Sequence, residues 1–236
     1  MKGGSGAETT SGELWPRGVL FDLDGTLADS FPTIHRALAA VLAQEGLPER
    51  SFEWVVAHVG RGATALVRDA VAPCTDEALV QRLVHRYAQA YGAIPLSETL
   101  PREGARGAVA FAAAGTGGRV AVVSNRTTAQ AMDWLEYWGF AEVLAVVSGP
   151  DRSGATKPAA AAVQPVLEAL GVTAAEALLV GDSAIDAHTA AGVGMAALLV
   201  GVRELEDVPG CRVELIKSLR EFPAWLVHNG KGWRYD

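Results

Sequence analysis

The sequence is poor in several features that would point to particular classes of protein. It has only two cysteines, Cys74 and Cys211, and neither belongs to a CxxC pair, which argues against a disulfide framework and a cysteine metal site. No apolar run approaches the roughly 18 residues of a membrane span, and the N-terminal stretch lacks the apolar core of a signal peptide. We therefore expect a cytoplasmic protein with reduced thiols and no membrane partner.

A basic surface is also lacking. The 236 residues carry a formal net charge of −7, and the sequence pI is about 5.3. No cluster of Lys and Arg offers the footprint that a nucleic-acid backbone requires, so we expect no nucleic-acid partner. A small anion can still bind, because a local site can oppose the net charge. Half of the residues are apolar, which suits one large domain or two unequal ones with a substantial core.

Short apolar runs alternate with helical patterns over much of the chain. Buried strands are expected at 18–21, 119–123, 143–147, 177–180 and 196–200. Helices are expected at 103–114, 127–138 and 159–170, and a last one from a capping box at Ser218 to about Val227. Strands that alternate with helices predict a parallel sheet covered on both faces, and thus an α/β fold.

A block of helices interrupts this alternation. Residues 31–98 contain helical patterns and no convincing strand, so we expect an inserted α-helical cap domain there. Residues 18–30 and 99–236 would then form the catalytic core. The Gly/Ser/Thr-rich residues 1–17 are expected to be a flexible N-terminal tail.

Polar side chains follow three of the expected strands at the point where each strand ends. Asp22 and Asp24 follow the first strand, Ser124 and Asn125 the second, and Asp182 the strand at 177–180. Ligands of parallel sheets bind beyond the carboxyl ends of the strands, so these side chains should converge on one rim. Asp22 and Asp24 are two residues apart, which places both side chains on the same side of an extended backbone.

Carboxylates brought this close repel each other, and burying them unpaired is costly. A hard divalent cation removes the conflict, and an all-oxygen ligand set without Cys or His favours Mg²⁺. Such an ion usually completes its shell with water and a substrate phosphate, and Lys157 would neutralise more of the phosphate charge. One carboxylate can then attack phosphorus, while a second protonates the leaving oxygen and activates water.

Four short segments together resemble a known family. "DLDGTLADS" (22–30), Ser124-Asn125, Lys157-Pro158 and "GDSAID" (181–186) look like the ordered motifs of the haloacid dehalogenase-like superfamily. They are most similar to its phosphoglycolate-phosphatase-like members with a helical cap, over nearly all of 18–227. The resemblance implies a Rossmann-like parallel sheet core, a mobile cap, and hydrolysis of a small phosphorylated metabolite through an aspartyl-phosphate.

The resemblance also implies a role for each motif residue. Asp22 is expected to be the nucleophile, and Asp24 the general acid/base with its backbone carbonyl on Mg²⁺. The other expected roles are phosphate binding and catalysis for Ser124 and Lys157, metal binding for Asp182, support of the metal shell or of Lys157 for Asp186, and substrate contact for Thr26 and Asn125. The expected metal set is thus Asp22, Asp24, Asp182 and Asp186.

One further candidate lies in the expected cap. In "HVGRGATAL" (58–66) two glycines flank Arg61, so a turn could present its guanidinium to a substrate anion. The competing interpretation is an ordinary surface arginine in a loop.

Several functions remain open within the family. Asp24 argues against a haloalkanoate dehalogenase, and the lack of lysine in 31–98 argues against a phosphonoacetaldehyde hydrolase. A β-phosphoglucomutase-like sugar phosphomutase is possible, although Gly181 stands where those enzymes usually have an acidic residue, which favours hydrolysis. Pyrophosphatase activity, nucleotidase activity and an inactive binding or regulatory relative also remain open. We expect a monomer or homodimer.

Overall fold

The computed structural model describes residues 15–74, 76–202, 205 and 207–230. Its centre is a six-stranded sheet in the order β5-β4-β1-β6-β7-β8, with every neighbouring pair parallel. The strands are β1 (Gly18–Phe21), β4 (Val120–Val123), β5 (Val146–Ser148), β6 (Ala177–Gly181), β7 (Ala196–Val200) and β8 (Val213–Ile216). The expected α/β fold with a Rossmann-like core is confirmed.

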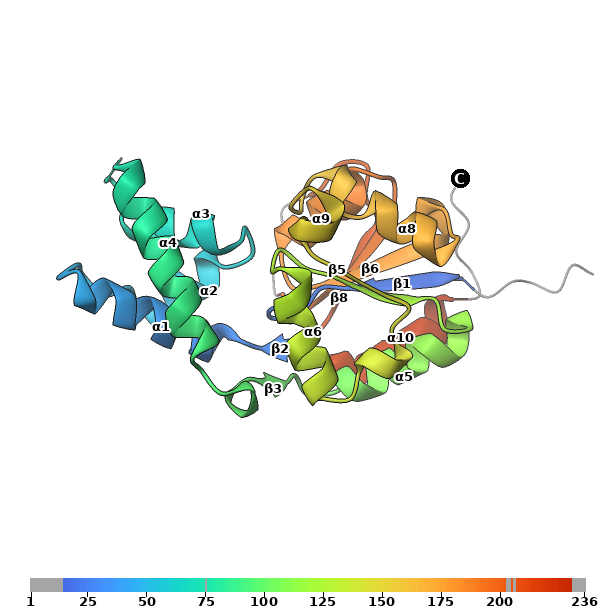
Figure 1. Cartoon of the computed structure of the whole chain (residues 1–236). Helices are drawn as coiled ribbons and strands as arrows, with labels where there is room; N and C mark the ends of the chain where they lie inside the picture. The colour runs from blue at the N-terminus through green and yellow to red at the C-terminus, as the bar shows by residue number, and fades with distance from the viewer. Residues whose placement is uncertain (1–14, 75, 203–204, 206, 231–236) are drawn as a thin grey trace, which may run out of the picture.

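Helices cover both faces of this sheet (Figure 1). One face carries α5 (Ala105–Thr116), α6 (Thr128–Tyr137) and α10 (Phe222–Asn229), and the other carries α8 (Gln164–Leu170) and α9 (Ala184–Ala191). Successive residues of β1 point to opposite faces, so Val19 and Phe21 join the first apolar core and Leu20 the second. The central strands are wholly apolar because both of their faces are buried.

Four helices between β1 and β4 form a separate group beside the sheet (Figure 1). They are α1 (Phe31–Gln44), α2 (Phe52–His58), α3 (Ala63–Ala70) and α4 (Glu77–Gly92). We call residues 31–92 the helical segment. Its helices pack on one another, α1 against α2 and α4, and α3 against α2 and α4. A short antiparallel ribbon of β2 (Ala28–Asp29) and β3 (Leu100–Pro101) joins the two chain passages that connect it to the sheet.

The structure differs from the sequence-based expectations in several places. The helix expected at 159–170 is the 3₁₀ turn η3 (Ala160–Ala162) followed by α8, with Pro165 in the first turn of the new helix. The strand expected at 143–147 is shifted, because the 3₁₀ turn η2 (Ala141–Val143) precedes β5. The remaining short helices are η1 (Leu96–Glu98), α7 (Pro150–Ser153), η4 (Ala174–Glu176) and η5 (Leu219–Glu221).

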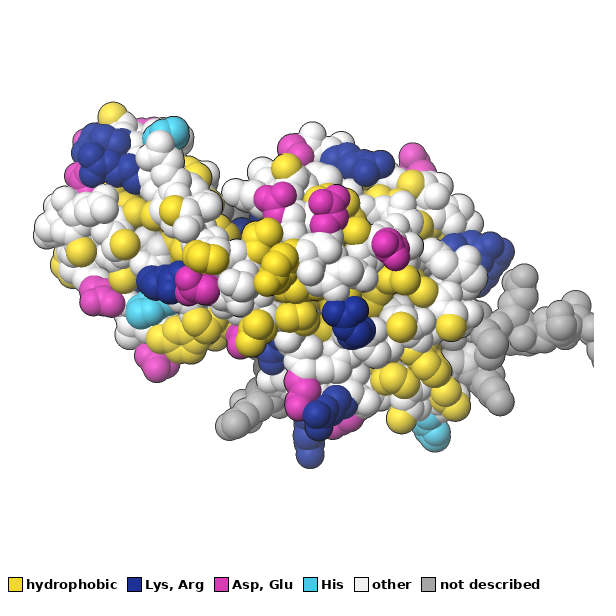
Figure 2. All heavy atoms as spheres, turned by 60° about the horizontal axis from the view of Figure 1, so that its bottom comes forward, with side chains coloured by type: hydrophobic (Ala, Val, Ile, Leu, Met, Phe, Trp, Pro, Cys, Tyr) yellow, Lys and Arg dark blue, Asp and Glu magenta, His cyan; other side chains and the backbone are white. Residues whose placement is uncertain are grey.

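The first described residues are held against the core, no described helix can span a membrane, and the face shown in Figure 2 carries no basic stripe. Residues 1–14 of the expected tail lie outside the described residues, whereas Trp15 donates its backbone N–H to Gly230 and Arg17 pairs with Glu176. Among the described residues, no helix combines the length and apolarity needed to cross a membrane. On the face shown in Figure 2, Lys and Arg side chains are scattered rather than gathered in a stripe.

Candidate active site

The carboxyl ends of β4, β1 and β6 open onto one cavity of about 570 Å³, a size typical of small-molecule sites. These three strands are neighbours in the sheet, so the residues that follow them meet. Asp22 follows β1, Ser124 follows β4 and Asp182 follows β6, and all three line the cavity. Loop 59–63 of the helical segment lines it from the opposite side.

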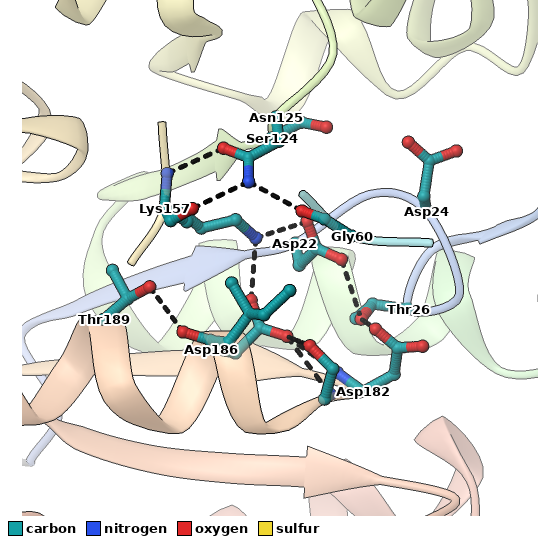
Figure 3. A network of polar contacts seen from close by, with 12 residues as sticks. Asp22, Asp24, Thr26, Gly60, Ser124, Asn125, Lys157, Asp182, Asp186 and Thr189 are labelled. Atoms are coloured by element: carbon teal, nitrogen blue, oxygen red, sulfur yellow. Dashed lines mark hydrogen bonds and ion pairs between the residues drawn. The ribbon is translucent and has the colours of Figure 1, made fainter. Parts of the chain in front are cut away.

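A buried lysine joins two of the carboxylates (Figure 3). Lys157 Nζ donates to Asp22 Oδ1 at 2.5 Å and to Asp186 Oδ1 at 2.7 Å, and all three side chains are less than a tenth exposed. The other Asp186 oxygen accepts from the Ser183 hydroxyl at 2.9 Å and from the backbone N–H groups of Asp182 and Ser183. Asp186 is therefore held from two sides, and Lys157 is oriented by two carboxylates.

The cluster carries more negative charge than Lys157 balances. Burial raises the pKa of Asp22 to about 7, even though Lys157 opposes the shift. Burial, and then the charges of Asp22 and Asp186, raise the pKa of Asp182 as well. Burial alone would lower the pKa of Lys157, but its two carboxylate partners raise it, so the lysine stays protonated. The site therefore favours an additional cation.

Three carboxylates are placed to hold that cation. One oxygen each from Asp22, Asp182 and Asp186 lies within 4.8 Å of the other two. Thr26 Oγ1 lies between two of these residues, 3.5 Å from Asp22 Oδ2 and 3.4 Å from Asp182 Oδ1. The donors are all oxygens, which is the set that hard divalent cations prefer. The residues present therefore fit a bound metal ion.

Two glycines make room for the cluster. Gly25 has a φ of +84°, and a Cβ on it would lie 2.0 Å from Asp182 Oδ2. A Cβ on Gly181 would lie 2.2 Å from Asp186 Cγ. A side chain at position 181 and the observed position of the Asp186 carboxyl group are therefore mutually exclusive.

Asn125 connects the helical segment to the core. Its amide Nδ2 donates to the Gly60 carbonyl at 2.6 Å and to the Lys157 carbonyl at 2.9 Å, and its Oδ1 accepts from the Lys157 N–H at 2.7 Å. Ser124 Oγ accepts the Arg126 backbone N–H at 3.1 Å, and the side chain is buried at the cavity wall. Both residues of this motif therefore lie at the site, and Asn125 also positions the backbone of Lys157.

Two residues expected at the site have other partners. Asp24 lines the cavity, but its carboxylate is turned away from Asp22 (Figure 3). Arg126 binds this carboxylate instead. Arg61 also lines the cavity, but it pairs with Asp69, and half of its side chain is exposed.

Two arginines that were not predicted from the sequence, Arg126 and Arg102, line the same cavity. Arg126 directly follows the Ser124-Asn125 motif, which was the available signal. Arg102 lies just after β3, and its charge lowers the pKa of Asp182 against the stronger effect of burial.

The raised pKa values predict how metal-free protein responds to pH. A carboxyl group whose folded pKa exceeds its unfolded value favours folding at low pH, and this contribution is lost as the pH rises through the folded pKa. For Asp22 the loss falls between about pH 4 and pH 7.

Replacing Asp182 with Asn removes a repelling charge, so we expect the Tm of metal-free protein at pH 8 to rise by roughly 2–8 °C, with a smaller rise at pH 5. Thermal unfolding in EDTA measures both.

Asp133→Asn is the control for this stability prediction, because Asp133 is exposed on α6 and outside the cavity. It should change Tm by the same small amount at both pH values. Adding MgCl₂ should stabilise the wild type more than Asp182→Asn. A variant that is less stable than the wild type at pH 8 without metal would contradict the proposed repulsion.

Comparisons of the sequence and of the structure with known proteins agree on one family. The family model described as haloacid dehalogenase-like hydrolase matches residues 19–200. The phosphoglycolate phosphatase of Rhodospirillum rubrum is 35% identical over 187 residues, covering 76% of this chain and 77% of the relative. The plasmid phosphoglycolate phosphatase of Cupriavidus necator is 35% identical over 220 residues, covering 89% of this chain and 92% of the relative.

A solved structure shows the same fold. CbbY from Rhodobacter sphaeroides in complex with phosphate superposes with a TM-score of 0.69 at 21% identity, covering 87% of this chain and 95% of CbbY. The family model spans β4, β5, β6, β7 and all of β1 except Gly18, together with the helical segment and all three carboxylates of the cluster. The chain therefore belongs to the haloacid dehalogenase-like hydrolase family.

Proposed function

We propose that this chain is a Mg²⁺-dependent phosphomonoesterase that acts on 2-phosphoglycolate or a close analogue. The observation that carries the proposal is the Asp22 carboxylate, which Lys157 holds at 2.5 Å. Asp24, two residues after Asp22, lines the same cavity, as do Asp182 and Asp186. The substrate assignment rests on the two relatives named phosphoglycolate phosphatase, each 35% identical.

The proposed reaction has two steps. Asp22 attacks phosphorus while Asp24 gives a proton to the leaving oxygen, which produces an aspartyl-phosphate and the free alcohol. Asp24 then takes a proton from water, and the resulting hydroxide attacks phosphorus, which releases phosphate and restores Asp22. Lys157 neutralises phosphoryl charge, and the Ser124 hydroxyl and the Asn125 side chain border the phosphate position. Bound Mg²⁺, held by Asp22, Asp182 and Asp186, would supply further electrostatic stabilisation of the transferring group.

Gly181 favours hydrolysis over a mutase reaction in this proposal. A phosphomutase-like acidic residue at position 181 would need the space that the Asp186 carboxyl group fills. The site as built has no room for both.

Phosphate release from a panel of phosphorylated metabolites tests the proposed function. We expect release from 2-phosphoglycolate in MgCl₂, and at least about a 100-fold loss of rate in EDTA that MgCl₂ restores. Absence of release from every phosphomonoester tested would overturn the proposal. If a sugar phosphate in the panel is instead converted to an isomer that still carries its phosphate, the chain is a mutase.

Arg61 is expected to contribute to substrate binding, as its place in loop 59–63 predicts. Its ion pair with Asp69 is partly solvent-exposed and therefore weak, so the guanidinium can exchange partners. We expect Arg61→Ala to raise KM by about 3–10-fold with kcat within twofold, because the lost contact would serve ground-state binding. Steady-state kinetics measure both; an unchanged KM would assign Arg61 to the surface alone.

A further inference from the structure

Arg126 is a buried cation at the cavity wall that the proposed chemistry does not use. It follows β4 and lines the cavity, with its side chain only 9% exposed. Its Nη2 donates to Asp24 Oδ1 at 2.8 Å and its Nε to Asp24 Oδ2 at 3.2 Å. This two-point geometry matches a planar carboxylate.

Aromatic rings fix the guanidinium in place. Arg126 Cζ lies 4.5 Å from the ring centre of Tyr91, on α4 of the helical segment, and 4.5 Å from that of Trp134, on α6 of the core. The two rings also contact each other edge to face at 6.1 Å. Contacts of this kind hold a cation where solvent is largely excluded. The site is thus a built receptor for one carboxylate group.

In this arrangement Asp24 cannot serve as a proton donor or acceptor. Both of its carboxylate oxygens are engaged by Arg126, and the group is turned away from Asp22 (Figure 3). To reach a leaving oxygen beside Asp22, Asp24 must release the guanidinium. A buried cation left without a partner is strongly unfavourable, so another anion should replace Asp24 at that moment.

We propose that Arg126 recognises a carboxylate on the leaving group, which takes the place of Asp24 on the guanidinium. The released Asp24 carboxylate then takes up a proton from solvent and can give it to the leaving oxygen. This inference rests on the proposed phosphatase function and adds the substrate class and the residue that selects it. Arg61 suits this role less well, because it is half exposed and pairs with Asp69. In 2-phosphoglycolate, one methylene separates the ester oxygen from a carboxylate, so the group that needs the proton lies next to the group that binds Arg126.

Two substrates that differ only in the carboxylate test the proposal. 2-Phosphoglycolate carries it, and 2-hydroxyethyl phosphate has a hydroxymethyl group instead. For the wild type we expect kcat/KM to favour 2-phosphoglycolate by about 100-fold or more, since a site built to bind a charged group rejects an analogue that lacks it. Arg126→Gln should lower kcat/KM for 2-phosphoglycolate by about 100-fold and should not lower that for 2-hydroxyethyl phosphate, because without Arg126 the Asp24 carboxylate no longer has to be displaced. Arg126→Lys keeps the positive charge but lacks the two-point geometry of the guanidinium, so its kcat/KM for 2-phosphoglycolate should lie between those of the wild type and Arg126→Gln.

Arg106→Gln is the matched control. Arg106 Cζ also lies over an aromatic ring, 5.0 Å from the ring centre of Phe140, and the guanidinium donates to the Trp138 carbonyl. Arg106 does not line the cavity. In Arg106→Gln, the ratio of kcat/KM for 2-phosphoglycolate to kcat/KM for 2-hydroxyethyl phosphate should equal that of the wild type. Equal losses on both substrates in Arg126→Gln, or no loss on either, would overturn the proposal.

Binding separates this inference from the proposed function. In Asp22→Asn protein, we expect Arg126→Gln to weaken calorimetric binding of 2-phosphoglycolate by at least about 30-fold and that of inorganic phosphate by less than threefold. If the wild type hydrolyses neither substrate, the proposed function fails, and this binding difference still decides the inference. If both substrates are hydrolysed but the binding difference is absent, the inference alone fails.

Discussion

Replacing Asp22 with asparagine is expected to lower kcat for phosphate release by about 10⁴-fold or more, because an amide cannot form the acyl-phosphate bond. The substitution is nearly isosteric, and it removes one charge from a cluster that has an excess of carboxylates. It also removes one of the two carboxylate partners of Lys157, which offsets the relief of repulsion, so we expect a folded protein with a Tm close to that of the wild type. Phosphate release and intact-protein mass after acid quench measure the two consequences: wild type should show a phosphorylated species, and Asp22→Asn should not.

Asp29→Asn serves as the control for the Asp22 variant. Asp29 lies in the same stretch of sequence, but it is exposed in β2 and outside the cavity. Its variant should retain activity within about twofold. A kcat for Asp22→Asn within tenfold of the wild type, or a phosphorylated species on that variant, would remove Asp22 from the nucleophile role.

Replacing Asp24 with asparagine should produce a second large effect, whose form depends on the leaving group. With 2-phosphoglycolate we expect kcat to fall by about 10²–10⁴-fold, since the alkoxide then leaves without a proton donor. An aryl phosphate such as p-nitrophenyl phosphate has a leaving group that needs no proton. With it, Asp24→Asn should still form the aspartyl-phosphate and then stall, because no base activates water.

Rapid-mixing kinetics reveal this difference directly. Asp24→Asn should release up to one p-nitrophenolate per active site in a burst, followed by slow turnover, while Asp22→Asn should show no burst. A steady rate without a burst, reduced equally for both kinds of substrate, would indicate that Asp24 acts on binding or folding rather than on proton transfer. Thermal unfolding supplies the check on folding, since Asp24→Asn also weakens the contact with Arg126.

The central strands were predictable because each is a continuous apolar run buried on both faces, as in β1, β6 and β7. The edge strand β8 was not predicted. Of its four residues only Ile216 is buried, and Glu214 interrupts the apolar run, so its apolar signal is weak; its pairing with β7 exists only in the folded sheet. The break before α8 had a visible cause in Pro165, which suits the first turn of a helix better than its interior.

Within the candidate site, the positions that follow strands were predictable, because parallel strands deliver their ends to one rim. Asp22 and Asp182 were assigned in this way, Lys157 and Asp186 received their roles from the family motifs, and the structure brings all four together. The partner of Asp24 was not predictable. Arg126 is 102 residues away from it, and its two aromatic contacts come from α4 and α6, so only the tertiary structure shows the arrangement.

The three hydrogen bonds of Asn125 have a consequence for the order in which a ligand would enter. Two of them hold the main chain of Lys157, and only the third reaches the carbonyl of Gly60. If loop 59–63 swings away, the direct hydrogen bond that breaks is worth only about 1 kcal/mol, and the lysine keeps both of its backbone supports. The phosphoryl end of a ligand should therefore dock on an already assembled half of the site, and the organic end should be enclosed afterwards.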